Sequence, residues 1–377
     1  MKFKVKDMDI ATGGIHIALL HAQDAKSLDL AMGDRVVVRD HTRELTCVLD
    51  ITNNEKVVQQ GQIGLFEEVL DRLKVHNKSN VTILFTGKPH SVTFIRNKLL
   101  GKKLGYAEFL QICDDITHDR LTDIEKTYFV SACYTNGMTN DEIVNLTKAM
   151  VDTGVRLKFP GVTLDKHCIG GVPGNRTTMV VIPIVAAAGF VIPKTSSRAI
   201  TSPAGTADTM ECLARVELSE AEIKQVVKKT GACIVHGGSI NLAPADDKII
   251  EVEHPLSVDA EGQMLASVMA KKYSVSASHV LIDIPMGKTS KAKNPKEARH
   301  LKTMFEMVGR RLGMNVKVVV TDGSAPIGRG VGPLLEAQDV MAVLANAPNA
   351  PQDLKAKAIS MAGILLELTG KYKHGER

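Results

Sequence analysis

The sequence contains no tryptophan, and aromatic residues make up only 4% of its 377 positions. Proteins that bind single-stranded nucleic acid stack bases on aromatic side chains, so this composition argues against that class. The excess of basic residues is also small, with 47 Lys and Arg against 42 Asp and Glu and a formal charge of +5. Such a dispersed surplus is not the basic stripe of a DNA-binding protein, but it suits a cleft that receives a small anion.

Cysteines are few and scattered, six in all with no Cys-x-x-Cys pair, which indicates neither a zinc site nor a disulfide framework. The longest apolar stretch, residues 179–192, is interrupted by Pro183 and is shorter than the roughly 20 residues of a membrane-spanning helix. The N-terminal sequence MKFKVKDMDI lacks the apolar core of a signal peptide. We therefore predict a soluble, cytoplasmic protein that binds neither membrane nor nucleic acid.

Residues 1–86 carry short β-branched or alternating runs separated by Gly and Asp turns, which predicts a small β-rich domain, most simply a barrel. The expected strands are Phe3–Val5, Arg35–Val38, Leu45–Leu49 and Val81–Phe85, with a short helix over Ile63–Leu73.

Residues 87–160 change to a helical periodicity and predict a helical domain, joined by residues 244–275 of the later chain. Two capping boxes, Thr122-x-x-Glu125 and Thr139-x-x-Glu142, each open an amphipathic run. The second run is expected to stop at Gly154, read as the residue after the helix C-cap.

Residues 161–243 and 276–377 alternate strand-like and helix-like segments, the pattern of an α/β domain. Val280–Ile284 and Val316–Val320 are compact apolar runs that predict parallel strands. The expected helices are Arg176–Gly189, Ala207–Ala214, Ala221–Thr230 and Glu336–Leu344. A helical domain beside an α/β domain leaves a cleft, a common place for ligands.

Two segments rich in glycine or hydroxyl residues precede expected helices. The first, DKHCIGGVPGN at 165–175, offers close backbone approach, a helix N-terminus and the charge of Lys166 to an anion. The second, KTSSRAITSPAGTAD at 194–208, could surround a phosphate with hydroxyls and the fork of Arg198. The first could equally be a solvated glycine-rich turn. The second could be a flexible polar loop with Thr206 serving only as an N-cap, but the apolar helix on each side argues against this.

A row of polar residues follows at spacings of four: Asp259, Gln263, Ser267 and Lys271. This spacing places them on one face of a helix over Ala260–Lys272. The face is either solvent-exposed or the wall of a cleft. The residues between them are largely apolar, so the helix is amphipathic.

The segment GKTSK at 287–291 follows an expected strand. It is not a nucleotide P-loop, because the position that needs a second glycine is Ile282. Lys288 and Lys291 could still hold a phosphate, or they could belong to a solvated loop.

The motifs DKHCIGGVPGN, KTSSRAITSPAGTAD, NLAPADDKI and SVMAKK, in this order, resemble the thymidine phosphorylase family over nearly the whole chain. The likeness is greatest to its nucleoside-monophosphate branch, the AMP phosphorylases, which carry a small β-rich N-terminal domain. The resemblance implies an α/β fold with a helical domain, and a cleft of the nucleoside phosphorylase and phosphoribosyltransferase type between them. It also implies a homodimer or larger homo-oligomer.

The reaction implied by the resemblance is phosphorolysis, in which inorganic phosphate attacks C1′ of the ribose while the base departs. AMP would give adenine and ribose 1,5-bisphosphate, and CMP and UMP are further candidate substrates. No metal or organic cofactor is expected.

The resemblance assigns the attacking phosphate to Lys166, Ser197 and Thr206, and makes Asp259 the general acid that protonates the leaving base. A carboxyl donor needs a raised pKa to work near neutrality, so partial burial of Asp259 is expected. The residues that would contact the nucleotide are Gly171, Ser197, Arg198, Ala199, Ile200, Thr201, Ser202, Thr206, Ser267 and Lys291.

Two lysines add to this site. Lys271 matches a family lysine that faces the base. Lys288 joins Lys291 as a hypothesised holder of the 5′-phosphate, because both follow the same expected strand.

Three departures from the family pattern bear on substrate choice and assembly. Cys168 stands where nucleoside-specific relatives carry a phosphate-binding serine. Glu253 and His254 stand near the place of the Arg-Asp pair with which those relatives read a pyrimidine. The chain stops at LLELTGKYKHGER, whereas family members continue into a further C-terminal domain.

Three alternatives to an AMP phosphorylase remain open. A pyrimidine-nucleoside phosphorylase would not need the 5′-phosphate. A phosphoribosyltransferase would use a pyrophosphorylated sugar with magnesium. A truncated nucleotide-binding protein would bind AMP and phosphate without turnover.

Overall fold

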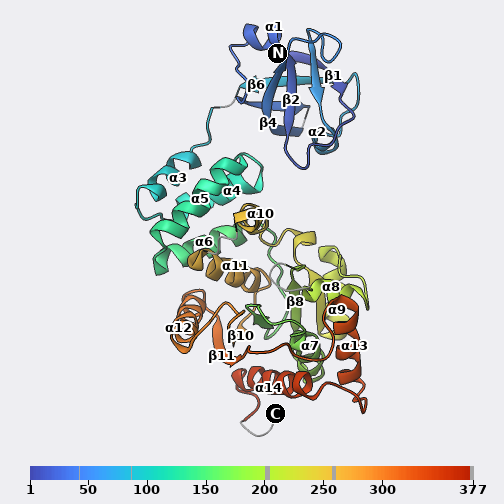
Figure 1. Cartoon of the computed structure of the whole chain (residues 1–377), viewed down its shortest axis with the longest axis vertical. Helices are drawn as coiled ribbons and strands as arrows, with labels where there is room; N and C mark the ends of the chain where they lie inside the picture. The colour runs from blue at the N-terminus through green and yellow to red at the C-terminus, as the bar shows by residue number, and fades with distance from the viewer. Residues whose placement is uncertain (42, 86, 200–203, 257–259, 374–377) are drawn as a thin grey trace. The chain divides into compact units, whose positions relative to one another are not determined.

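The computed structural model describes residues 1–41, 43–85, 87–199, 204–256 and 260–373. The chain divides into two compact units (Figure 1). One contains Met1–Thr93 and His118–Thr122, and the other contains Phe94–Thr117 and Asp123–Arg377.

The first unit is built on a closed barrel with the strand order β1-β5-β2-β4-β3-β6. Its strands are β1 (Lys2–Asp7), β2 (Ile17–His21), β3 (Arg35–Asp40), β4 (Arg43–Thr52), β5 (Gln62–Leu65) and β6 (Asn80–Phe85), with helices α1 (Ala22–Ser27) and α2 (Glu67–Leu73). β1 pairs with β5 and β2 with β4 in parallel, while the other pairs are antiparallel. The predicted β-rich barrel is confirmed.

The helix expected over Ile63–Leu73 is wrong in its first part, because Ile63 and Leu65 lie in β5 and the helix begins only at Glu67. Both side chains are fully buried in the barrel core. Periodicity cannot separate a strand from a helix in so short an apolar run. The pairing of β5 with β1 and β2, distant in sequence, decides the outcome.

Helix α3 (Ser91–Leu99) spans the division between the two units. The helices named next form the helical part of the second unit. They are α4 (Tyr106–Thr117), α5 (Asp123–Asn136), α6 (Asn140–Asp152), α10 (Pro244–Glu253) and α11 (Glu261–Ser274). α10 packs against α4 and α5, and α11 packs against α6. The two late helices therefore complete a bundle begun by the early ones.

The capping box predicted at Thr139 and Glu142 is present. Thr139 Oγ1 accepts from the Glu142 backbone N–H at 3.3 Å, and the Glu142 carboxylate accepts from the Thr139 N–H at 2.9 Å. Glu142 also accepts from the buried Lys98 ammonium at 2.6 Å. The cap thus ties the start of α6 to α3.

Gly154 has a different role from the one expected. The helix ends at Asp152, and Gly154 does not have a positive φ. A Cβ at Gly154 would lie 2.5 Å from the Leu242 carbonyl oxygen. The position requires glycine because two backbones approach closely there, not because a helix cap needs a left-handed residue.

The α/β part of the second unit contains a parallel sheet of β7 (Leu164–Cys168), β10 (His279–Met286) and β11 (Asn315–Asp322), in the order β11-β10-β7. A second parallel pair is formed by β8 (Ile192–Ser196) and β9 (Ala232–His236). The parallel strands predicted at 280–284 and 316–320 are confirmed as parts of β10 and β11. The flanking helices and turns are α7 (Thr177–Ala187), α8 (Thr206–Glu211), α9 (Glu220–Thr230), η1 (Gly238–Ile240), η2 (His254–Leu256), α12 (Pro295–Arg311), α13 (Pro333–Leu344) and α14 (Gln352–Leu368).

Helix α7 carries mostly apolar side chains around its circumference, and most of its residues are buried or half-buried. It packs against α14 (Figure 1). Val181 and Val185 of α7 and Leu365 of α14 are fully buried in the same hydrophobic core. Burial of each such side chain contributes about 2 kcal/mol. This packing fixes the start of α7, and with it the glycine-rich loop that connects it to β7.

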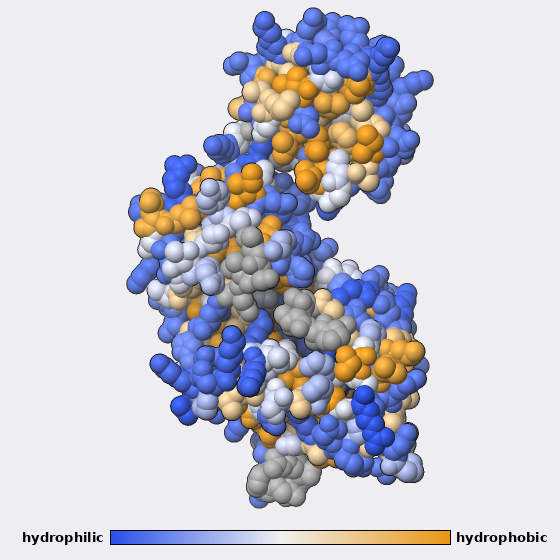
Figure 2. Space-filling model, viewed as in Figure 1, coloured by the Kyte–Doolittle hydropathy of each residue, from blue (hydrophilic) through white to orange (hydrophobic). Residues whose placement is uncertain are grey.

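Hydrophilic side chains cover most of the face of each unit that Figure 2 shows, with apolar side chains in separate patches. In the described part of the chain, none of the helices is both long and apolar enough to span a lipid bilayer.

Candidate active site

A cavity of about 470 Å³ lies in the second unit. Its walls come from the loops that follow β7 and β8, from α10 and α11, and from the segment after β10. Segments far apart in the sequence, 165–175, 194–208 and the polar face of α11, therefore meet around one space. Its volume falls in the range of small-molecule sites.

The loop after β7 forms one wall, which includes Gly170, Val172 and Asn175. Gly171 has a φ of +92°, and a Cβ there would lie 2.7 Å from the Ser290 Cα. The backbone at position 171 therefore packs closely against the segment after β10, and only glycine fits at this position. Gly171 itself is not among the described residues that line the cavity.

His167 and Cys168 line the cavity at the end of β7. Burial, reinforced by the charges of Lys272 and Lys194, holds the pKa of His167 well below its ordinary value, so the imidazole is neutral. Burial also raises the pKa of the Cys168 thiol, which accepts a hydrogen bond from Asn175 Nδ2 at 3.2 Å. A neutral thiol at this position offers an anion less than a serine hydroxyl would, because S–H is a weak donor.

Lys166, predicted to hold the attacking phosphate, is fully buried behind the cavity wall. Its ammonium donates to Thr177 Oγ1 at 2.8 Å and lies 3.9 Å from the Asp283 carboxylate. Burial lowers the pKa of Lys166, while Asp283 opposes that effect. Thr177, the first residue of α7, in turn donates to the side chain of Asn175 in the cavity lining at 3.1 Å.

The loop after β8 contributes Ser196, Ser197 and Thr206 to the cavity lining. Ala199 lies in the same loop but turns its N–H to the Asp208 carboxylate at 2.8 Å. Of the residues predicted here, Ile200, Thr201 and Ser202 lie outside the described residues, as does Asp259, the predicted general acid.

Arg198 lines the cavity, but its guanidinium is already paired with carboxylates. It lies 2.6 Å from Glu211, 3.2 Å from Glu217 and 3.2 Å from Asp208. These acids raise the pKa of Arg198 and satisfy the fork that sequence reasoning had assigned to a phosphate. In this structure Arg198 therefore pairs with carboxylates, and its role toward a phosphate stays a prediction.

The polar row that the spacing placed on one face of α11 forms part of the cavity wall. Gln263, Ser267 and Lys271 all line it. Ser267 Oγ and Lys271 Nζ donate to the same oxygen of Asp246 on α10, at 2.8 and 2.6 Å. Burial alone would lower the pKa of Lys271, but the charge and hydrogen bond of Asp246, together with nearby carboxylates, outweigh it and raise that pKa, so the lysine stays protonated.

A second lysine in the lining, Lys194, was not among the predicted site residues. Its ammonium lies 3.5 Å from one oxygen of the buried Asp165, and Lys272 lies 2.9 Å from the other. Two lysines thus share one carboxylate. Burial, together with the charge of Lys272, holds the pKa of Lys194 well below its ordinary value.

The two lysines after β10 differ in position. Lys291 lines the cavity and is partly buried, whereas Lys288 is exposed and is not among the described lining residues. Glu253 and His254, at the end of α10, also line the cavity.

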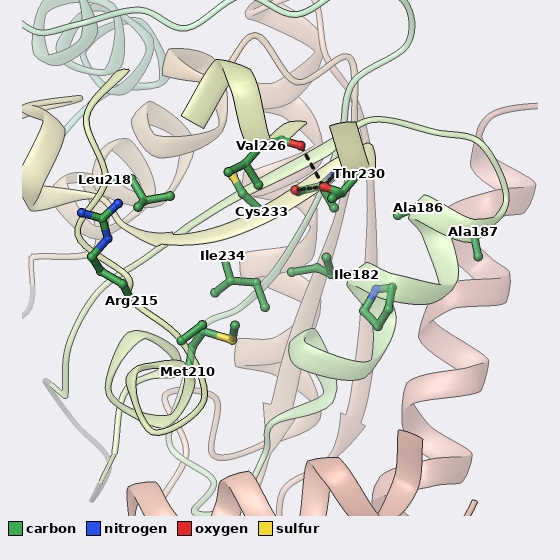
Figure 3. A pocket seen from close by; sticks show the side chains of 13 residues that line it. Ile182, Ala186, Ala187, Met210, Arg215, Leu218, Val226, Thr230, Cys233 and Ile234 are labelled. Carbon is green, nitrogen blue, oxygen red and sulfur yellow. Dashed lines mark hydrogen bonds between the residues drawn. The ribbon is translucent and has the colours of Figure 1, made fainter. Parts of the chain in front are cut away.

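A second cavity, of about 650 Å³, lies between α7, α8, α9 and β9 (Figure 3). Apolar side chains such as Ile182, Met210 and Ile234 line it. The Thr230 hydroxyl at its edge donates to the Val226 carbonyl at 2.9 Å, inside its own helix. Arg215, a charged side chain of this lining, is already paired with Glu222. A charged substrate would lose its hydration there for few polar partners in return, so the smaller cavity is the candidate active site.

The sequence was compared with those of known proteins. Residues 92–154 match the "Glycosyl transferase family, helical bundle domain" and residues 161–372 match the "Glycosyl transferase family, a/b domain". A protein of Bradyrhizobium sp. (strain BTAi1) named "Putative thymidine phosphorylase" is 44% identical over 379 residues, which cover 99% of this chain and 74% of the relative. The chain belongs to the thymidine phosphorylase family.

Family members with other names are equally similar. "AMP phosphorylase 1" of Archaeoglobus fulgidus is 44% identical over 376 residues, covering 100% of this chain and 74% of the relative. A solved structure with a related fold is anthranilate phosphoribosyltransferase from Thermus thermophilus, with a TM-score of 0.59 and 18% identity over 74% of this chain and 89% of that one. These findings confirm the predicted fold class and assign the chain to the phosphorylase-type pentosyltransferases.

Proposed function

We propose that this family member catalyses phosphorolysis of nucleoside 5′-monophosphates, with AMP as the main substrate and CMP and UMP as further ones. The observation that carries the proposal is the meeting of four segments in one cavity: two loops with anion-binding groups, the polar face of α11, and the segment that carries Lys291. A phosphate, a base and a 5′-phosphate each need one of these walls.

The attacking phosphate belongs at the loops after β7 and β8. Ser197 and Thr206 offer hydroxyls there, and the charge of Lys166 lies behind the wall. Holding phosphate and ribose next to each other makes a bimolecular reaction effectively unimolecular, which lowers its activation free energy by several kcal/mol. We assign to Asp259, which precedes Gln263 by four residues in the sequence, the donation of a proton to the leaving base.

The base belongs at the α10–α11 wall. Ser267 and Lys271 face it, oriented by Asp246. Glu253 and His254 provide a carboxylate and an imidazole where nucleoside-specific relatives are expected to carry an Arg-Asp pair. This difference supports a base other than thymine.

A second candidate function is phosphorolysis of pyrimidine nucleosides. It is favoured by relatives such as the Bradyrhizobium protein, whose name refers to thymidine. The two functions differ in one requirement, since only the monophosphate reaction needs Lys291 to bind a 5′-phosphate.

The deciding experiment measures base release from AMP, adenosine and thymidine, each with and without inorganic phosphate, in metal-free buffer. We expect phosphate-dependent release of adenine from AMP and little from adenosine. Phosphate-dependent release of thymine from thymidine alone would establish the second function. Activity that needs added magnesium and a pyrophosphorylated sugar would indicate a phosphoribosyltransferase, and binding of AMP without release would indicate a protein without turnover.

A further inference from the structure

Arg176 is a buried arginine beside the candidate phosphate site that the family motifs did not single out. It precedes the first residue of α7, and its side chain is 7% exposed and lines the cavity. A guanidinium cannot lose its proton inside a protein, so its burial needs partners that satisfy it.

Three groups supply those partners. Nη1 donates to Thr206 Oγ1 at 3.0 Å, Nη2 donates to the Ala204 carbonyl at 2.8 Å, and Nε donates to the Glu336 carboxylate. These contacts use three of the five N–H groups of the guanidinium. Arg176 therefore joins the start of α7, the start of α8 and helix α13 at one point.

Glu336 balances the charge of Arg176. Its side chain is fully buried and also accepts from the Gly332 backbone N–H at 3.1 Å. Because the two charges compensate each other, Arg176 acts on the cavity less through net charge than through the direction of its hydrogen bonds. Removing it would leave a buried carboxylate uncompensated, which is costly.

The bond to Thr206 has a chemical consequence. A hydroxyl has one proton to donate and two lone pairs that accept. Since Thr206 Oγ1 accepts from a cation, its own proton is free to point elsewhere, and Thr206 lines the cavity. Acceptance from a charged donor also strengthens the hydroxyl as a donor.

We propose that Arg176 is the positioning residue of the phosphate subsite: it holds Thr206 Oγ1 as an acceptor, so that the hydroxyl donates its proton to the phosphate oxygen. The proposal rests on the proposed function, which identifies the anion as the phosphate co-substrate. It gives Arg176 a part in binding phosphate, not nucleotide, and makes Thr206 the group through which it acts.

The experiment compares Arg176→Gln, Thr206→Val, the double variant and the control Thr147→Val. Thr147 is a fully buried threonine of α6 whose hydroxyl donates to the Ile143 carbonyl at 2.7 Å, and it is not among the described lining residues. The readouts are the KM for phosphate, the KM for AMP, and the Kd of inorganic phosphate measured by calorimetry without nucleotide.

We expect Arg176→Gln and Thr206→Val each to raise the KM and Kd of phosphate about tenfold while the KM of AMP changes less than twofold. The double variant should be no worse than either single one, because both remove the same donor. Thr147→Val should lower the thermal midpoint and leave the Kd of phosphate unchanged. If the effects of Arg176→Gln and Thr206→Val multiply, or Arg176→Gln leaves the Kd of phosphate unchanged, the inference is wrong.

Should Arg176→Gln fail to fold, Arg176→Lys decides the question. It keeps the charge beside Glu336 but cannot reach Thr206 and Ala204 together, so a severalfold rise in the Kd of phosphate supports the inference and an unchanged Kd overturns it. Phosphate binding also separates this inference from the proposed function. If the wild-type protein releases no base, the proposed function is contradicted. If Arg176→Gln nevertheless weakens the binding of phosphate, the role of Arg176 is supported.

Discussion

Lys271 and Asp246 form an ion pair of 2.6 Å that joins α11 to α10 at the wall of the cavity. The Asp246 side chain is almost fully buried, and the same oxygen accepts from Ser267 at 2.8 Å. One carboxylate thus orients both groups of α11 that are assigned to the nucleobase. Its neighbour Asp247 is not among the described lining residues, so two adjacent aspartates have different roles.

We expect Asp246→Asn to lower kcat/KM for AMP about 10- to 100-fold, because Lys271 loses its counter-charge and Ser267 loses a carboxylate acceptor. The KM for phosphate should change little, since phosphate is assigned to the opposite wall. Steady-state kinetics with each substrate varied in turn measures both. Asp247→Asn is the matched control and should retain activity within about threefold; equal losses in the two variants would mean that the ion pair has no special role at the site.

Asp247 provides a prediction of stability against pH. Burial raises its pKa from the ordinary 3.8 to about 6, with Lys271 opposing and Asp246 reinforcing the shift. The folded protein therefore holds this proton more tightly than the unfolded chain, so the contribution of this group to stability is present below pH 4 and is lost as the pH rises through 6. Relative to wild type, Asp247→Asn should gain about 2 kcal/mol in free energy of unfolding between pH 4 and pH 7.5. Urea denaturation at the two pH values tests this, and a difference that does not change with pH would contradict it.

Lys291 separates nucleotide from nucleoside recognition. It lines the cavity, so Lys291→Ala should lower kcat/KM for AMP about 10- to 100-fold while that for adenosine falls less than threefold, because only AMP carries the anion that pairs with it. Lys288→Ala should affect AMP much less, since Lys288 is exposed and outside the described lining. Parallel assays with the two substrates measure the ratio; equal losses on AMP and adenosine would remove Lys291 from the 5′-phosphate site.

Local patterns predicted the elements that bring these residues together. The spacing of four along α11 correctly placed Gln263, Ser267 and Lys271 on one face, because that face follows from helix geometry alone. The compact apolar runs correctly predicted β10 and β11 as parallel strands. Both signals lie within about a dozen residues, which is the range over which sequence periodicity is informative.

Such local patterns could not predict contacts between residues that are far apart in the sequence. Arg176 and Glu336 are 160 positions apart, and nothing local marks Arg176 as buried. The sequence does not show that Arg198 pairs with Glu211 and Glu217, because these pairs depend on where α8 and the segment after it lie in the fold. Lys166 directly precedes two cavity residues of β7, His167 and Cys168, but its complete burial depends on elements distant in sequence that pack around the strand. Charge–charge contacts of this kind follow from tertiary packing.

Gly171 tests whether the glycine-rich loop is set by backbone packing. It has a φ of +92°, and an added Cβ would lie 2.7 Å from the Ser290 Cα, a backbone atom that cannot turn aside. Gly161 is the matched control, with a φ of +81° and no atom within 4 Å of an added Cβ. Alanine at either position has an unfavourable left-handed conformation that costs about 1 kcal/mol, and only at Gly171 is a collision added.

We therefore expect Gly171→Ala to lower the free energy of unfolding by about 3 kcal/mol or more, against about 1 kcal/mol for Gly161→Ala. Urea denaturation followed by circular dichroism measures both, since the chain has no tryptophan to report by fluorescence. Gly171→Ala should also weaken phosphate binding, because relief of the collision moves either the β7–α7 loop or the segment that carries Lys291. A loss of stability no greater than that of Gly161→Ala would show that the loop moves aside freely, and the close contact with Ser290 would then not be what holds it in place.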